Sequence, residues 1–459
     1  MFPFGFSTFL ATGSGGSGVG DQGAGHPTPL KSRGRLGGVL TPDPCSLTPQ
    51  SGMIRMNNSA PEPFVLGVNY WPARSGMYWW QHFDKSVLAD DLERIQQSGL
   101  YIVRVFLLWE DFQARARKVS TPCLDRLVEV AEKADQRGLC VLPTFFTGHM
   151  CGLNWLPPWA LWARERELPI PVFSQRKVRS NLPRNFYEDP EILEAQVLLI
   201  REVAGALQGH PAVWAWDLGN SPSSVVTPPD NQTASMWLRV MGEELRSRDE
   251  TIPITLGMDK GNLAGQGVLR PQDAAEHLDF LSMQAFPFSS ELSSGPLDAL
   301  LPPFLTILTR WLGGKDVMCL GFGIPTEPVP RQQWVHKEPG AELLVSEQAA
   351  AGFFLSVLER LREAGMMGAV ISFFSDFDPG LWEMPPLDGD LPGRHMGIYR
   401  RDRSPKDLEP ILREQGSLER RPLPDEPPSW IDISPEEYDT DPKLHVRRLY
   451  ENYRDYHSG

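Results

Sequence analysis

The sequence predicts an α/β protein whose main domain is a (β/α)8 barrel, also called a TIM barrel. Between about residues 64 and 375, eight short apolar runs rich in β-forming residues alternate with amphipathic helical segments. This alternation is typical of repeated βα units around a parallel sheet, and eight units are the number that closes such a barrel. The 459-residue chain is 41% hydrophobic, which allows a large packed core.

Each predicted strand is a run of seven to nine mostly apolar residues. The runs are evenly distributed, with enough chain between consecutive runs for a crossover helix. In chain order, the predicted strands span residues 64–71, 101–109, 139–146, 212–219, 252–258, 279–286, 316–323 and 368–375.

The segments between these runs carry helix boundaries, most clearly the one after the third strand. Asp189 is a predicted N-cap, and Pro190 lies in the first turn. An apolar stripe from Leu193 to Leu207 follows, and Gly209 ends the helix. The other predicted helices span residues 87–97, 124–136, 233–246, 300–311 and 346–363.

Two further segments flank the predicted barrel, which occupies residues 63–416. Residues 1–62 are rich in Gly, Ser and Pro without periodicity, which predicts a flexible, disordered tail. Residues 417–459 form an acidic, proline-rich extension that ends in a predicted helix from Pro442 to Tyr456, capped by Asp441. We expect this C-terminal helix to pack on the barrel or to contact a protein partner.

The charge of the chain excludes some classes of partner. Its formal net charge is -14 and its pI is about 5.2, whereas nucleic acids and anionic membrane surfaces attract a basic face. No apolar run reaches the roughly 20 residues of a membrane span. No basic segment precedes the apolar stretch at the N-terminus, so the sequence favours a cytoplasmic over a secreted location.

The spacing of cysteine and histidine gives no sign of a metal or a cofactor. The cysteines are scattered and form no C-x-x-C pair, so we expect buried thiols rather than disulfides or zinc ligands. No two histidines have metal-ligand spacing. We therefore predict neither a metal nor a cofactor.

In such a barrel, functional residues lie at the carboxyl ends of the strands and in the loops that follow them. These positions are rich in aromatic residues, which stack on the C–H faces of sugar rings, and in side chains that bond hydroxyl groups. Aromatic residues also plug barrel ends, which is the structural alternative for each of them. The predicted contacts to an oligosaccharide or glycoside are Tyr70, Trp71, Arg104, Trp109, Glu110, His149, Trp155, Asn220, Gln284 and Phe286.

Six motifs within about residues 65–416 carry a family resemblance. They are LGVNYWP, VRVFLLWEDF, PTFFTGHM, HPAVWAWDLGNSP, GFGIPT and DFDPGLWEMPP. Together they resemble the retaining β-glycosidases of clan A, most closely the cellulase-type proteins of glycoside hydrolase family 5. The resemblance implies a double displacement. One Glu after strand four protonates the leaving oxygen, and another after strand seven attacks the anomeric carbon.

Both carboxylates that the resemblance implies are replaced in this sequence. The family motif Asn-Glu-Pro corresponds to Asn220, Ser221 and Pro222, so Ser221 stands at the acid/base position. The family motif Glu-Phe-Gly begins with Gly321 here, at the nucleophile position.

Other family positions are partly changed. A strand-six tyrosine that orients the nucleophile aligns with Phe286, and a strand-eight tryptophan aligns with Ser372, whereas Arg104, His149 and Asn220 keep the expected types. Phe286 agrees with the missing nucleophile, because a buried phenol without its carboxylate partner would be unpaired.

Three functions remain open from the sequence. The preferred one is a pseudo-glycosidase that binds a β-linked carbohydrate without cleaving it, since loss of a general acid alone lowers the rate by about 10² to 10⁴. The second is an active cellulase- or mannanase-type hydrolase with displaced carboxylates, with Glu327 as the first substitute. Asp217 is excluded because it lies roughly 13 Å deeper than Ser221 at about 3.3 Å per residue. The third is a structural or interaction protein with a vestigial cleft.

Overall fold

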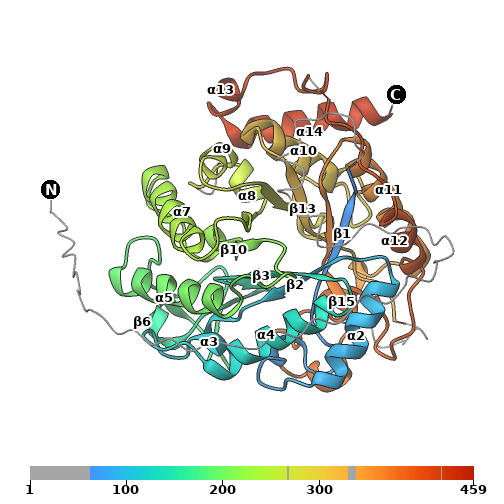
Figure 1. Ribbon diagram of the computed structural model, residues 1–459. Coiled ribbons are helices and arrows are strands. Elements are labelled where there is room, and N and C mark those ends of the chain that lie inside the picture. The colour runs from blue at the N-terminus through green and yellow to red at the C-terminus, as the bar shows by residue number, and fades with distance from the viewer. Residues whose placement is uncertain (1–61, 266–267, 329–337, 425, 459) are drawn as a thin grey trace, which may run out of the picture. The chain divides into compact units, whose positions relative to one another are not determined.

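The computed structural model describes residues 62–265, 268–328, 338–424 and 426–458. Its central element is a closed barrel of eight parallel strands in the order β1-β14-β13-β12-β11-β10-β3-β2 (Figure 1). The (β/α)8 fold is therefore confirmed, and each predicted run overlaps one barrel strand, although the strands are shorter than the runs. The barrel strands are β1 (Val65–Asn69), β2 (Ile102–Phe106), β3 (Cys140–Thr144), β10 (Trp216–Asn220), β11 (Ile254–Met258), β12 (Leu281–Gln284), β13 (Val317–Phe322) and β14 (Gly368–Ile371).

Alternation along the strands separates the barrel interior from the helix-covered outside. In β2, Ile102 belongs to a compact cluster with Leu142 and Met318 from other strands, whereas Val103 and Val105 join the larger core beneath the helices. This smaller cluster fills the lower interior of the barrel. Two residues further along β2, the same parity carries Arg104 to the inside, above that cluster.

The helices around the barrel follow the predicted pattern. They are α2 (Lys85–Gln97), α4 (Thr121–Asp135), α5 (Pro190–Ala206), α7 (Asn231–Arg246), α10 (Leu301–Gly313) and α11 (Glu347–Glu363). At the start of α5, the Asp189 carboxylate accepts hydrogen bonds from the backbone N–H groups of Glu191 and Ile192, which confirms the predicted N-cap. Gly209 follows the helix with a φ of 70°, in the region that favours glycine.

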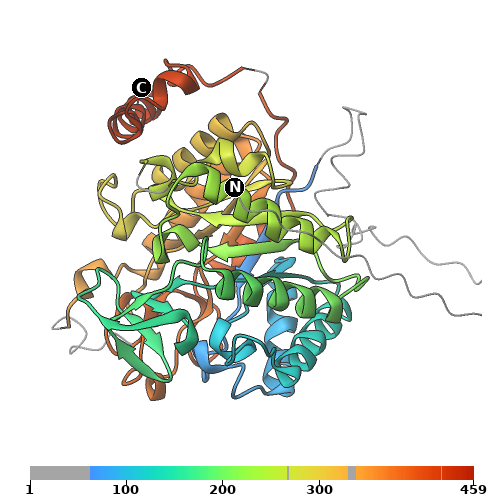
Figure 2. The same ribbon diagram turned by 90° about the vertical axis from the view of Figure 1, so that its left-hand side faces the viewer.

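An insertion after β3 is the part of the barrel domain that the sequence did not predict. It contains six short strands: β4 (His149–Met150), β5 (Leu153–Trp155), β6 (Leu161–Glu165), β7 (Val172–Ser174), β8 (Lys177–Arg179) and β9 (Asn181–Pro183). They form one four-stranded and one two-stranded sheet, visible in teal and green at the lower left of Figure 2. The insertion follows the carboxyl end of a barrel strand, so it lies where functional loops of this fold are found.

The predicted C-terminal helix is present and packs on the barrel domain. This helix, α14 (Pro442–Ser458), lies against α10 (Figure 1). The Phe304 ring of α10 lies 4.8 Å from the ring of Tyr450 and 5.6 Å from that of Tyr453, between centroids. The Tyr450 hydroxyl donates to Asp298 at 2.7 Å. A protein contact through this helix stays a prediction.

We expect Tyr453→Ala to lower the free energy of unfolding by about 3 kcal/mol, because truncation of a buried aromatic residue leaves a cavity. Tyr453 is 1% exposed. The control on the same helix is Leu444→Ala, which should change stability by less than about 0.5 kcal/mol because Leu444 is 56% exposed. Urea denaturation of both variants measures the difference. Equal midpoints would show that α14 does not stabilise the barrel.

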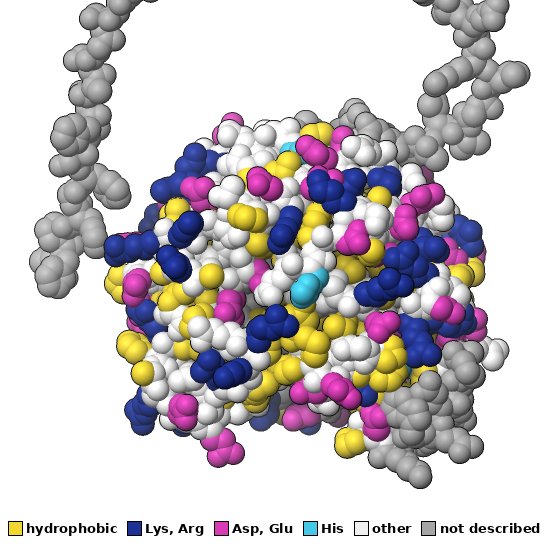
Figure 3. Space-filling model, turned by 90° about the horizontal axis from the view of Figure 1, so that it is seen from below, with side chains coloured by type: hydrophobic (Ala, Val, Ile, Leu, Met, Phe, Trp, Pro, Cys, Tyr) yellow, Lys and Arg dark blue, Asp and Glu magenta, His cyan; other side chains and the backbone are white. Residues whose placement is uncertain are grey.

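Three observations concern the flanks and the surface. The predicted tail of residues 1–62, apart from Glu62, lies outside the described residues, as does Cys45. None of the helices in the described ranges combines the length and apolarity of a transmembrane span. On the face seen in Figure 3, basic, acidic and apolar side chains are interspersed.

Candidate functional site

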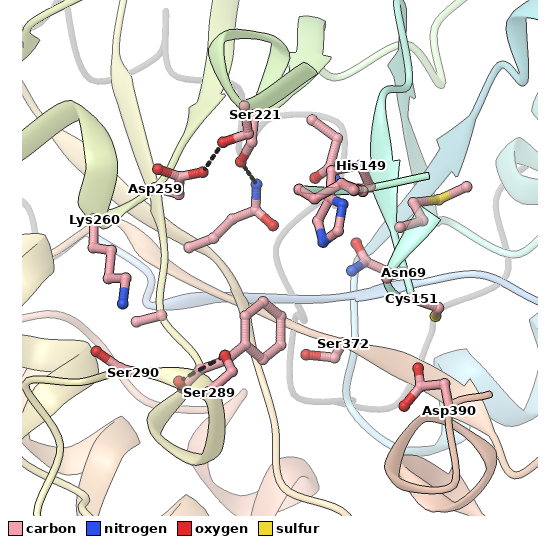
Figure 4. Close-up of a pocket in the computed structure, with 18 of the residues that line it drawn as sticks. Asn69, His149, Cys151, Ser221, Asp259, Lys260, Ser289, Ser290, Ser372 and Asp390 are labelled. Atoms are coloured by element: carbon pink, nitrogen blue, oxygen red, sulfur yellow. Dashed lines mark hydrogen bonds between the residues drawn. The ribbon is translucent and has the colours of Figure 1, made fainter. Parts of the chain in front are cut away.

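A cleft of about 860 Å³ opens at the carboxyl ends of the barrel strands (Figure 4). Its walls come from the segments that follow β1, β3, β10, β11, β12 and β14. Five of the predicted substrate contacts and the predicted acid/base position line it: Trp71, His149, Asn220, Gln284, Phe286 and Ser221. Asn69, at the end of the first strand, lines it as well, and the structure adds residues that the sequence did not single out, among them Cys151, Lys260, Phe288 and Asp390.

A buried ion pair lies beneath the cleft. Arg104 and Asp217 are both 0% exposed, and the Arg104 Nη2 atom lies 2.6 Å from Asp217 Oδ2. Thr144 donates to the same carboxylate oxygen at 2.8 Å, and the backbone N–H of Gly257 donates to the other at 3.1 Å. Burial lowers the pKa of Arg104, and the adjacent carboxylate opposes this effect. Asp217 is thus a structural partner of Arg104, as its predicted depth indicated.

The remaining N–H groups of Arg104 donate hydrogen bonds to residues at the bottom of the cleft. They reach the backbone carbonyl of Leu320 at 3.2 Å, Asn220 Oδ1 at 3.2 Å and Asn69 Oδ1 at 3.5 Å. With the partners of Asp217, the network joins strands β1, β2, β3, β10, β11 and β13. Arg104 was predicted to touch substrate, but it is fully buried under the cleft and positions the two asparagines instead.

Asn220 and His149 fix one side of the cleft. The Asn220 amide donates to the backbone carbonyl of His149 at 2.9 Å, which ties the end of β10 to the insertion after β3. Burial lowers the pKa of the His149 imidazole, so we expect a neutral ring at physiological pH. A neutral imidazole can hydrogen-bond a hydroxyl group as donor or as acceptor.

Ser221 occupies the position that the family resemblance gives to the proton donor. Its backbone is left-handed, with φ 50° and ψ 55°, which is uncommon for a residue other than glycine. Its hydroxyl accepts a hydrogen bond from the Gln284 amide at 3.0 Å. Neither a hydroxyl nor a carboxamide supplies an acidic proton near neutral pH. The pair is a hydrogen-bonding device and is not an acid/base catalyst.

Gly321 occupies the position that the family resemblance gives to the nucleophile, and it has no side chain. It lies opposite Gln284 in the β12–β13 register. A Cβ atom built on Gly321 would lie 3.4 Å from Gln284 Cγ and 3.7 Å from Phe286 Cζ, which are ordinary van der Waals contacts. The glycine therefore leaves a small open space between an amide side chain and an aromatic ring.

Two carboxylates line the cleft, Asp259 and Asp390, and they lie on opposite sides of it (Figure 4). Asp259 caps α8 (Lys260–Leu263): its oxygens accept from the Gly261 N–H at 2.8 Å and from the Ser224 hydroxyl at 2.7 Å. Asp390 accepts from the Gly393 N–H at 3.0 Å. Burial raises the pKa of Asp390. Both carboxylates are thus engaged by the loops that carry them.

Besides Arg104, five predicted contacts lie away from the main cleft or present little surface to it. Tyr70 is 0% exposed and donates to Asp91 at 3.1 Å, so it belongs to the core. Trp71 does line the cleft, but its ring stacks on Phe106 at 5.0 Å and is 1% exposed. The remaining three, Trp109, Glu110 and Trp155, line a second and smaller cavity.

The second cavity has a volume of about 310 Å³. Trp109 opens the helix α3 (Trp109–Phe112) instead of ending strand two, so Glu110 and Asp111 line this second cavity and not the main cleft. Glu110 accepts from the Gln175 N–H at 2.9 Å. Burial raises the pKa values of both carboxyl groups, that of Asp111 to about 6.

Glu327, the predicted substitute carboxylate, is not among the residues that line the cleft. Its backbone N–H donates to the Val345 carbonyl at 2.8 Å, which fixes the chain beyond β13. Ser372, at the position of the family tryptophan, lines the cleft and donates to the Phe322 carbonyl at 2.5 Å. Within the described ranges, no three His, Cys, Asp or Glu side chains are grouped as metal ligands.

The residues missed by sequence reasoning come from long loops. Asp390 and Cys151 are examples: burial raises the pKa values of both groups, and the thiol is within hydrogen-bonding reach of the carboxylate. They are 239 positions apart in the chain (390 minus 151), and neither directly ends a barrel strand. Lys260 lies two residues after the end of β11, and this position could have identified it from the sequence as a candidate cleft residue.

Comparison with known proteins supports the fold. No family model matches the chain. It is 25% identical over 235 residues to a β-glucuronidase of Mus musculus, which covers 51% of this chain and 33% of that protein. The chain thus spans about a third of the length of the curated relatives it matches.

Two solved structures illustrate the likeness in three dimensions. GH5_18 from Streptomyces cattleya, in complex with GlcNAc, has a TM-score of 0.69 at 19% identity, covering 85% of this chain and 90% of that one. The exo-β-1,4-mannosidase Op5Man5 from Opitutaceae bacterium strain TAV5 has a TM-score of 0.63 at 23% identity, covering 78% and 60%. The chain is a glycoside-hydrolase-like TIM barrel. More particularly, its fold is the one shared by these GH5_18 barrels, in agreement with the resemblance found in the sequence.

Proposed function

We propose that this protein is a pseudo-glycosidase that binds a β-linked carbohydrate in the cleft without hydrolysing it. The observation that carries the proposal is the hydrogen bond of 3.0 Å between Gln284 and Ser221, next to Gly321. At the two positions where a retaining glycosidase has carboxylates, this chain has a hydroxyl held by an amide and no side chain.

The chemistry of glycoside cleavage makes these replacements decisive. A retaining mechanism needs two carboxyl groups about 5 to 5.5 Å apart, one to protonate the leaving oxygen and one to attack the anomeric carbon. Without the acid, the leaving alkoxide is not protonated. Without the nucleophile, no covalent intermediate forms. Binding requires neither group.

The cleft retains groups that suit binding. Asn69, Asn220 and Gln284 present amides, and His149 presents an imidazole, all of which hydrogen-bond sugar hydroxyls. Lys260 adds an ammonium group that has no ion pair among the described residues. The structural neighbours include complexes with GlcNAc and with Manb1-4GlcNAc, which supports a hexose-based ligand.

A second candidate function is hydrolysis by displaced carboxylates. The observation in its favour is the pair Asp259 and Asp390, which lie across the cleft from each other (Figure 4). The raised pKa of Asp390 suits a general acid. Against this role, both carboxylates already accept hydrogen bonds from their own loops.

We expect the purified protein not to accelerate the hydrolysis of 4-nitrophenyl β-glucoside, β-mannoside and β-glucuronide above the rate in buffer alone. The reason is the missing acid and nucleophile. Release of 4-nitrophenol measures the rate. The variants Asp259→Asn, Asp390→Asn and Glu327→Gln identify any residual catalyst: turnover that one of them abolishes would replace this proposal by the displaced-carboxylate mechanism.

Binding is tested by the melting temperature, because a ligand of the native state raises it by mass action. We expect manno-, gluco-, cello- or xylo-oligosaccharides to raise the melting temperature of the native chain, and Lys260→Asn to reduce the rise. Lys443→Asn, on the exposed surface of α14, is the matched control and should keep it. No rise with any sugar would contradict a binding role.

A further inference from the structure

We infer that the ligand of the cleft is an amphiphilic glycoside, a sugar that carries an alkyl or aryl group, rather than a longer oligosaccharide. This inference rests on the proposed function and adds the class of ligand. It is drawn from the division of the cleft into a polar part and an apolar part.

The apolar part begins at the end of β12. Phe286 and Phe288, on either side of Pro287, are half-buried and line the cleft. Their ring centroids lie 5.8 Å apart at an interplanar angle of 66°, so they form one continuous aromatic corner. Leu301 and Leu305 of α10 also line the cleft, but they are 0% and 1% exposed and present little surface to it. The two phenylalanine rings therefore supply the hydrocarbon surface of this corner, and Ser289 and Ser290, which follow them in the chain, line the cleft as well.

The apolar corner is continuous with the vacant nucleophile position. The tip of the Phe286 ring lies 3.7 Å from where a Cβ on Gly321 would be. The Gln284 amide borders this position on one side, and on the other the Phe286 ring gives a hydrocarbon group a contact out of water. The absence of a Gly321 side chain and the apolar Phe286 therefore favour the same kind of occupant.

The size of the cleft leaves room for both parts of such a ligand. Its 860 Å³ lies in the upper part of the range of about 300–1,000 Å³ typical of pockets that enclose drug-sized molecules. The polar groups gather around Asn69, Asn220 and Gln284, beside the Arg104 floor. One sugar ring uses these partners. A second sugar ring could stack one C–H face on Phe286 or Phe288, but hydroxyls at its edge would lose water against the other ring, which stands at 66° to the first.

The inference is tested by isothermal titration of the full-length protein with matched pairs of glycosides. The probes are methyl and octyl β-glucoside, methyl and octyl β-mannoside, and the disaccharides cellobiose and mannobiose, all below the micelle concentration of the octyl compounds. Each buried methylene contributes about fourfold in affinity. With partial burial of the chain, we expect the octyl glycoside of the preferred sugar to bind at least tenfold more tightly than its methyl partner.

Substitutions of phenylalanine test whether the higher affinity for octyl glycosides arises at the aromatic corner. We expect Phe288→Ala to reduce octyl-glycoside affinity by at least threefold while methyl-glycoside affinity stays unchanged, and Phe288→Leu to retain most of the octyl advantage. Phe83→Ala, another half-buried phenylalanine, is the matched control outside the cleft and should leave the ratio unchanged. Melting temperatures of all variants verify that they fold.

The outcomes separate the inference from the proposed function. Equal affinity for methyl and octyl glycosides, or tighter binding of a disaccharide than of the octyl glycoside, would overturn the inference and leave carbohydrate binding standing. An octyl advantage that Phe288→Ala does not reduce would place the alkyl group elsewhere and also overturn it. Binding of none of the six probes would contradict both.

Discussion

Replacing Asp217 by Asn should lower the free energy of unfolding by about 3–5 kcal/mol, the usual result of breaking a buried ion pair on one side. The substitution keeps the shape of the side chain but removes the charge. Arg104 then stays charged, fully buried and without its counter-ion, and the new amide hydrogens face guanidinium donors. Urea denaturation monitored by tryptophan fluorescence measures the loss as a shift of the midpoint at constant slope.

The matched control is a pair on the surface. Arg201 and Glu244 are joined at 2.9 Å, but the arginine side chain is 47% exposed. We expect Glu244→Gln to change stability by less than about 1 kcal/mol. Similar small losses for both variants would show that water or a neighbouring group compensates the buried charge, and the role assigned to the network would be wrong.

Restoring both carboxylates, with Ser221→Glu and Gly321→Glu together, should produce measurable hydrolysis of aryl β-glycosides. The Cβ of residue 321 finds only ordinary contacts of 3.4 Å or more, and a carboxylate at 221 can accept from the Gln284 amide that now bonds Ser221. General acid catalysis contributes about 10² to 10⁴ in rate. We expect at least a hundredfold increase over the native chain, measured as 4-nitrophenol release.

Isosteric variants serve as controls for this gain of activity. Ser221→Gln with Gly321→Gln has nearly the same volume but cannot transfer a proton or attack, so it should stay at the rate of the native chain. Each single Glu variant should remain well below the double one, because both groups are needed. Absence of turnover in a folded, sugar-binding double variant would mean that the cleft no longer holds the glycosidic bond between positions 221 and 321.

The barrel could be predicted because each element carries its own local signal. The strand around Val103 alternates between the barrel interior and the helix layer, and the Asp189–Pro190 start of α5 is a local capping motif. Such signals depend on neighbours in the chain. The short strands of the insertion after β3 carry no comparable signal, since five of the six have only two or three residues and β6, β8 and β9 contain no buried residue.

The residues of the candidate site were harder to predict, because their positions depend on where each strand ends and on the path of the loop that follows. The predicted strand two ran to Trp109, but it ends at Phe106, so Trp109 and Glu110 turn into a second cavity. Sequence position gives residue depth only while the strand continues. Arg104 and Asp217 lie within regular strands, and their depth could be judged. Asp390 comes from a loop whose path no local pattern fixes.

The hydrogen-bond network under the cleft separates stabilisation of the barrel from ligand recognition, two tasks that the same residues perform in many proteins. It joins five of the eight barrel strands through buried atoms beneath the cleft, which a bound molecule does not reach. Residues at the rim, such as Ser221 and Phe288, can therefore be exchanged with little effect on folding. In a barrel built in this way, single substitutions at the rim can remove one activity or add another while the fold stays stable. The barrel is therefore a suitable scaffold for engineering new binding specificities.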